Sequence, residues 1–60
     1  MTPKQKLIYL CEDTIEMHRR GKMKQVNDNN KEMFEIIDSC FPTLKGKINP
    51  NEIISELAKL

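Results

Sequence analysis

With 60 residues, ten Lys plus Arg, nine Asp plus Glu and a formal net charge of +1, the chain has room for one small domain and for no large enclosed catalytic cavity. Its 38% hydrophobic and 32% charged residues do not fit a disordered tail, and its near-neutral charge does not fit a polybasic binder of nucleic acid or membranes. The longest apolar run near the start, residues 7–11, is too short for a signal-peptide core or a membrane span, so we expect a cytoplasmic protein.

The first predicted helix covers residues 3–20. Thr2 as N-cap, Pro3 at the first helical position and Gln5 at the third form a capping box. Gly21 is placed to take the left-handed conformation that ends a helix. A step of about 100° per residue separates a polar half of the helix from an apolar half. The apolar half consists of Leu7, Ile8, Leu10, Cys11, Thr14, Ile15, Met17 and His18.

The second segment admits two interpretations. In one, residues 27–30 form a polar linker and a short helix capped by Asn29 covers residues 30–41. In the other, one helix covers residues 23–41, and Pro42 ends both versions. The continuous helix is preferred, because its apolar positions keep one phase and because it gives an antiparallel hairpin of two similar helices. Its predicted buried face consists of Met23, Val26, Asn30, Met33, Phe34, Ile37 and Phe41.

The last predicted helix covers residues 50–59 and follows a short basic connector at residues 43–47. Asn49 as N-cap, Pro50 and Glu52 repeat the capping pattern of the first helix. Ile48 and Ile53 are spaced to form a hydrophobic staple across the helix start. The apolar face of this helix consists of Ile53, Ile54, Leu57 and Leu60.

These elements predict an all-α fold, a small three-helix unit built on an antiparallel helical hairpin. The apolar arc of the first helix is about 180° wide, which exceeds what one antiparallel neighbour covers. The third helix can cover the surplus by folding back on the hairpin. A two-fold homodimer would bury the same surplus between its subunits, and both arrangements stay open.

Cys11, His18 and Cys40 are the residues that could suggest a metal site. Cys11 and His18 are seven residues apart, so their α-carbons lie roughly 10 Å apart along a helix, too far for one zinc ion. Both cysteines are predicted to be small core side chains without a disulfide. His18 is predicted either to satisfy a backbone carbonyl near the helix end or to line a solvated edge of the core. No nucleophile, base and orienting group can be assembled, so we expect no enzyme, no metal and no cofactor.

Tyr9 is the only aromatic side chain predicted to be exposed, and it lies among carboxylates. An exposed tyrosine in this setting is the kind of anchor found at protein interfaces. The leading hypothesis is therefore a non-enzymatic helical protein that binds and regulates a larger protein partner through a helix face. The residues predicted to make this contact are Tyr9, Glu12, Asp13 and Glu16.

Four cations lie within six residues at the tip of the hairpin, with no acid before Asp28. They support an alternative hypothesis, a small regulator that binds nucleic acid or another anion at this tip. The acidic body of the hairpin and the lack of tryptophan argue against a long nucleic-acid footprint. The Lys, Asn and Ile bias of the chain suits an A+T-rich bacterium or phage. The cations are Arg19, Arg20, Lys22 and Lys24.

Overall fold

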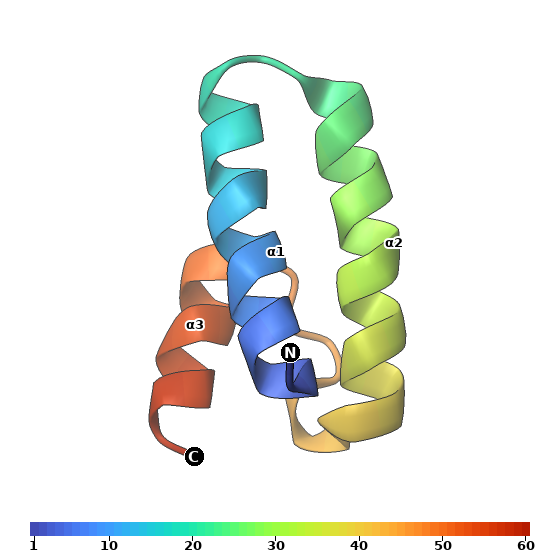
Figure 1. Ribbon diagram of the computed structural model, residues 1–60, viewed down its shortest axis with the longest axis vertical. Coiled ribbons are helices and arrows are strands. Elements are labelled where there is room, and N and C mark those ends of the chain that lie inside the picture. The colour runs from blue at the N-terminus through green and yellow to red at the C-terminus, as the bar shows by residue number, and fades with distance from the viewer.

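The computed structural model describes all residues, 1–60, as three α-helices and one turn of 3-10 helix (Figure 1). Helix α1 spans Pro3–Arg19, α2 spans Met23–Cys40 and α3 spans Pro50–Ala58, while the 3-10 turn η1 covers Pro42–Leu44. The predicted all-α, three-helix unit is confirmed. None of the helices combines the length and the apolar character that crossing a membrane requires.

Both ends of α1 form as its sequence predicts. The backbone N–H of Gln5 donates to Thr2 Oγ1 at 3.1 Å, and the backbone N–H of Thr2 donates to Gln5 Oε1 at 3.1 Å, which completes the capping box. At the other end Gly21 has a φ of 74°. The N–H groups of Gly21 and Lys22 donate to the carbonyl oxygens of His18 and Met17, and this Schellman motif satisfies the last carbonyls of α1.

Helix α2 runs without a break through residues 27–30, so the continuous helix is confirmed. Asparagine is a poor helix former in isolation, and a tertiary contact supports the helix at this point. Asn29 is 9% exposed, and its Nδ2 donates to Asp13 Oδ2 at 2.8 Å. A hydrogen bond between the two helices thus fixes the middle of α2 against α1.

The buried face of α2 differs from the predicted one. Asn29 is buried in preference to Asn30, because Asp13 of α1 offers it a hydrogen-bond acceptor. Ile36 packs against the core, whereas Phe34 is 43% and Met23 is 50% exposed. The expectation that Tyr9 is the only exposed aromatic is therefore wrong. The residues of α2 that are buried are Val26, Asn29, Met33 and Ile37.

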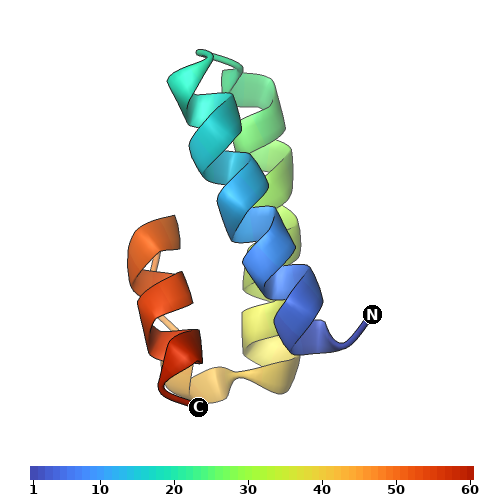
Figure 2. The ribbon, with the colours of Figure 1, turned by 60° about the vertical axis from the view of Figure 1, so that its left-hand side comes forward.

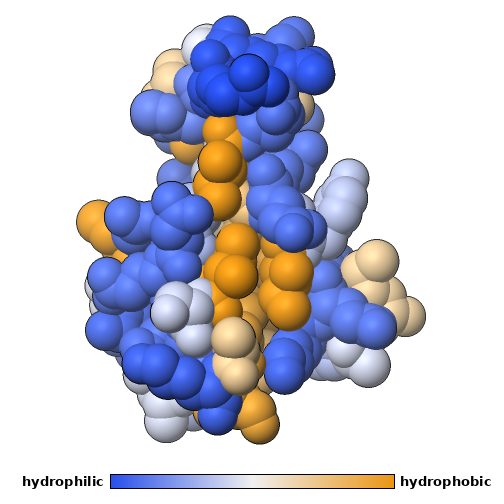
Figure 3. Space-filling model, turned by 90° about the vertical axis from the view of Figure 1, so that its left-hand side faces the viewer, coloured by the Kyte–Doolittle hydropathy of each residue, from blue (hydrophilic) through white to orange (hydrophobic).

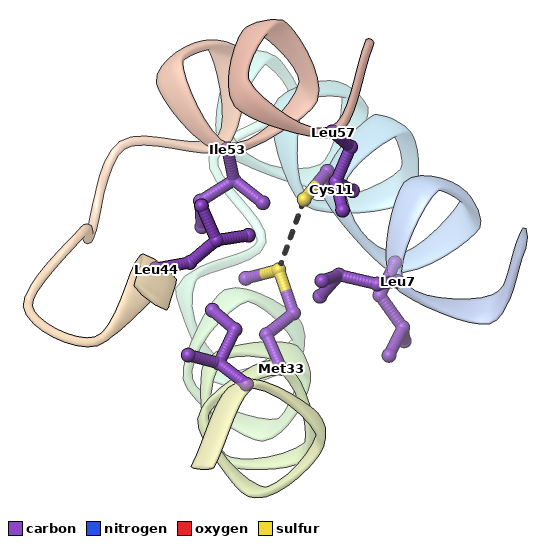
Figure 4. Close-up of a cluster of buried hydrophobic side chains, with 8 residues drawn as sticks. Leu7, Cys11, Met33, Leu44, Ile53 and Leu57 are labelled. Atoms are coloured by element: carbon purple, nitrogen blue, oxygen red, sulfur yellow. Dashed lines mark hydrogen bonds between the residues drawn. The ribbon is translucent and has the colours of Figure 1, made fainter. Parts of the chain in front are cut away.

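The core joins all three helices and the turn η1, and Figure 4 shows its side chains converging. Leu44 is 3% exposed, although it belongs to the connector that was expected to be short and basic. It enters the core because η1 packs against α2 and returns the chain toward α1. The fully enclosed side chains are Leu7, Cys11, Met33, Ile53 and Leu57.

Helix α3 packs antiparallel against α1 (Figures 1 and 2). It covers only the half of the hairpin that is remote from the α1–α2 turn. Its nine residues extend about 14 Å, against about 26 Å for the 17 residues of α1. Helix α1 is thus the central element, packed against α2 on one side and α3 on the other. The third helix accounts for part of the surplus apolar arc of α1.

Asn49 caps the start of α3 as predicted, but neither the capping box with Glu52 nor the hydrophobic staple with Ile48 forms. Asn49 Oδ1 accepts a hydrogen bond from the backbone N–H of Asn51 at 2.9 Å. Ile48 stays 73% exposed while Ile53 is fully buried, so the two side chains do not share a buried contact. Instead, Lys47 Nζ forms an ion pair with Glu52 Oε1 at 3.0 Å across the same turn. Leu60 is also outside the core, at 69% exposure.

The total accessible surface is 4242 Å², close to the value of about 4,000 Å² expected for a monomer of this mass. The fold therefore exposes little surface beyond that of an ordinary small monomer. The homodimer considered from the sequence stays a prediction for sedimentation analysis.

Candidate interaction surfaces

The candidate metal residues are spread over the molecule. Cys11 is buried as predicted. Cys40, the last residue of α2, is exposed and not in the core, contrary to the prediction, and the next residue, Phe41, packs against the core. His18 is exposed, and no side chain holds its imidazole. No group of three His, Cys, Asp or Glu side chains is positioned to hold a metal ion.

Tyr9 is displayed on a rigid part of the hairpin. It is 57% exposed, and it lies three residues after Lys6 and four before Asp13 on one stripe of α1. Lys6 Nζ lies 3.3 Å from Glu32 Oε2 of α2, and Asp13 accepts the hydrogen bond from Asn29. Both links join α1 to α2, so the backbone that carries Tyr9 is held on either side.

The four residues predicted to contact a protein partner have different surroundings. We call them the Tyr9 face: Tyr9, Glu12, Asp13 and Glu16. Asp13 is half-buried and engaged with Asn29. Glu16 accepts hydrogen bonds at 2.9 Å from Arg19 Nη2 and at 2.9 Å from Arg20 Nε. These hydrogen bonds, from Arg19 first and Arg20 second, lower the pKa of the Glu16 carboxyl below its ordinary value. Tyr9 and Glu12 are the members that are exposed and unpaired.

The four predicted cations are divided in the same way. Arg19 and Arg20 are held by Glu16, a pairing that their spacing of three and four residues could have predicted. Lys22 and Lys24 are exposed and form no ion pair. Helix α2 begins beside them with no side-chain cap and with no acid in its first turn. The positive charge at the tip is thus concentrated on two lysines and the start of α2.

Two methionines join these cations in a shallow hollow of about 560 Å³ at the α1–α2 turn. Met23 is 50% exposed and Met17 is half-buried. Helical periodicity places both on the packed face, because the sequence of one helix does not show where its neighbour stops covering it. We call this surface the methionine–lysine tip: Met17, Arg20, Lys22, Met23, Lys24 and Gln25.

A second open region, a cleft of about 510 Å³, lies where α3 begins. Because α3 is shorter than the hairpin, Ile15 and Val26 are left facing an open space beside the exposed Ile48. Figure 3, which views the α1 and α3 side, shows an apolar stripe down this face below a hydrophilic tip. His18 is the only titratable group of the cleft, so the region adds apolar surface without fixed charge.

Comparison with protein-family models, with curated proteins and with solved structures finds no significant match to this chain. The assignment of function consequently rests on the surfaces described above.

Proposed function

We propose that this chain is a non-enzymatic helical protein that binds and regulates a larger protein partner through the Tyr9 face of α1. The observation that supports the proposal is Tyr9 itself, 57% exposed on a helix that is tied to α2 on either side. Tyrosine is enriched at binding hot spots, because it offers a large apolar ring and a hydroxyl for little conformational entropy. A fixed backbone lowers the entropy lost on binding further.

Charge defines the partner surface that fits this face. Glu12 is exposed and has no ion-pair partner, so it can accept a hydrogen bond from a basic side chain. A matching partner has an apolar socket for the ring of Tyr9 and an Arg or Lys beside it. Asp13 and Glu16 would act indirectly, since each already has a partner within this chain.

The side-chain chemistry also favours binding over catalysis. The one thiol with a strongly shifted pKa, Cys11, is fully buried and cannot meet a substrate. His18 has no carboxylate that would orient it as a general base. Both cysteines are free, which supports a proposed location in the reducing cytoplasm.

The first test is site-specific photo-crosslinking in cells. A photoreactive phenylalanine analogue at position 9 is expected to give a discrete crosslinked product, and the same analogue at position 34 is expected to give none. Phe34 is the matched control, because it is also aromatic, helical and 43% exposed, on α2. A product from position 34 alone would move the interface to α2.

The partner identified in this way is then purified and titrated against single variants. We expect Tyr9→Ala to weaken binding by about tenfold or more, and Glu12→Lys to weaken it through charge reversal. Phe34→Ala and Glu35→Lys are the matched controls on α2, and their affinity should equal that of the unchanged protein. Unchanged affinity of Tyr9→Ala would contradict the proposal.

The alternative is a regulator that binds nucleic acid at the tip. Lys22 and Lys24 favour it, because they are unpaired beside the start of α2. The pairing of Arg19 and Arg20 with Glu16 weakens it, because this one carboxylate holds both guanidinium groups and cancels one of the four positive charges. Two free cations give a shallow salt dependence and little affinity for phosphates.

A further inference from the structure

The methionine–lysine tip combines unpaired positive charge with exposed apolar surface. Lys22 and Lys24 have no carboxylate within ion-pair distance, and Met23 is 50% exposed beside them. Met17 and Met23 line the same hollow of about 560 Å³ as these lysines. The tip is the end of the molecule that is remote from α3, so no element of the fold covers it (Figures 1 and 2).

The charge of this surface is fixed by both helices. Glu16 holds Arg19 and Arg20 on the α1 side, and no carboxylate enters the hollow. On the α2 side, Lys22 occupies the N-cap position without a side-chain hydrogen bond. The first turn of α2 contains no acid, so the positive end of its dipole adds to the two lysines. A ligand that complements this surface carries negative charge.

The apolar side chains of the methionines favour one class of anionic ligand over another. Their flexible, polarisable side chains are suited to apolar partners of variable shape. A phosphate backbone offers no apolar group to them, and the tip has no aromatic ring on which a base could stack. An acidic protein segment with interspersed Leu or Met offers carboxylates and apolar side chains together. We propose that the methionine–lysine tip binds an acidic, amphipathic segment of a protein partner.

In this arrangement carboxylates of the segment lie against Lys22 and Lys24, and its apolar side chains lie on Met17 and Met23. The tip adjoins the Tyr9 face through the ion pair of Arg20 with Glu16. Tyr9 itself lies eleven residues before Arg20 on α1, and its face carries carboxylates and fits a basic partner surface. The chain would thus present oppositely charged binding surfaces at its tip and along its middle.

The test uses fluorescence anisotropy with labelled synthetic peptides and the intact protein. The probe is a helical peptide with Glu and Leu on one face, compared with versions in which Gln replaces Glu or Ala replaces Leu. We expect the Glu and Leu peptide to bind, and each replacement to weaken binding by about tenfold. A labelled DNA duplex is titrated in parallel, because it carries the charge without the apolar groups.

Two variants locate the binding on the protein. Lys22→Glu with Lys24→Glu should abolish peptide binding while keeping α2 folded, because acids in the first turn favour a helix start. Met23→Ala should weaken binding of the Leu-containing peptide and leave the Ala-containing one unaffected. Lys4→Glu with Lys31→Glu is the matched control, since both lysines are exposed, helical and unpaired elsewhere.

Several outcomes would overturn the proposal. DNA binding without peptide binding would assign the tip to nucleic acid, and an equal effect of the control variant would reduce the attraction to overall charge. A Met23→Ala variant that binds every peptide normally would show that the methionine side chains do not contribute to binding. Tyr9→Ala should leave peptide binding unchanged, so failure at the tip and failure at the Tyr9 face are distinguishable.

Discussion

At the scale of single residues, Cys11 has the most altered chemistry in the protein. It is fully buried, and its thiol donates a hydrogen bond to Met33 Sδ at 3.5 Å (Figure 4). Burial, with a smaller contribution from the Glu12 carboxylate, raises the pKa of this thiol from 9.0 to about 11. Thiolate is the reactive form of cysteine, so Cys11 is inert in the folded protein, whereas Cys40 is exposed.

The shifted pKa of Cys11 predicts a loss of stability in alkali. The unfolded chain releases the thiol proton near pH 9 and the folded chain near pH 11, so deprotonation favours the unfolded chain between them. This contribution is complete below pH 9 and is lost as the pH rises toward 11. Between about pH 8 and about pH 10 the free energy of unfolding should fall by about 1 kcal/mol through this group.

Urea denaturation of the unchanged protein and of Cys11→Ala at both pH values measures this effect. All other side chains are the same in both proteins, so the difference between the two pH dependences isolates the thiol. Equal pH dependences would contradict the assignment. Iodoacetamide provides a second readout, because it should modify Cys40 in the folded protein and Cys11 only on unfolding.

At the scale of secondary-structure elements, the Asp13 and Asn29 hydrogen bond sets how α1 and α2 meet. It joins the middle of both helices at 2.8 Å and is partly buried. We expect Asn29→Ala to destabilise the fold by about 1 to 2 kcal/mol, because it leaves the Asp13 carboxylate unpaired. Asn30→Ala is the control, and it should be neutral or slightly stabilising, since alanine is the better helix former.

A double-mutant cycle of Asp13→Ala and Asn29→Ala, followed by urea denaturation, measures the coupling between the two side chains. We expect the double variant to cost less than the sum of the single ones, since each single change already removes the bond. Additive costs would show that Asn29 is buried for a reason other than its contact with Asp13.

The ends of the elements could be predicted because they depend on local chemistry. The capping box of Thr2 and Gln5, the positive φ of Gly21 and the stop at Pro42 each involve residues a few positions apart. The rotation of α2 about its own axis, which decides which of its residues are buried, could not be predicted. It depends on which side chains of α1 lie opposite each turn of α2. The burial of Leu44 was not predicted for the same reason, since it follows from the path that the connector takes through space.

The candidate surfaces show the same division. The exposure of Tyr9 followed from helical periodicity, and the clustering of cations near Gly21 followed from their closeness in the sequence. The pairing of Glu16 with Arg19 and Arg20 is predictable from their spacing of three and four residues on one helix. Nothing in the sequence predicts the exposed methionines of the tip or the open cleft, because both features result from where α3 stops covering the hairpin.

At the scale of the whole molecule, the two halves of the hairpin are stabilised unequally. The core of buried hydrophobic side chains lies where α1, α2 and α3 meet, whereas the half near the α1–α2 turn has only two helices in contact (Figure 2). Regions with few buried contacts open at a lower free energy than the core.

Amide hydrogen exchange measured by NMR should reveal this gradient. We expect the slowest exchange for amides of residues 11–14 and 33–37, which lie beside the shared core. Amides of residues 17–19 and 26–28, near the turn, should exchange at least about tenfold faster through local opening. Uniform protection along both helices would show that the hairpin opens only when the whole fold opens.

The connector between α2 and α3 has a further consequence. Leu44 is anchored in the core, so only residues 45–49 separate a fixed point from the start of α3. Helix α3 is thus an intramolecular ligand of the hairpin, held on a short tether at an effective concentration on the order of millimolar. Severing the chain between Leu44 and Asn49 would convert the fold into two components. Occupancy of the α3 position on α1 would then depend on how much of the last segment is supplied as a separate peptide.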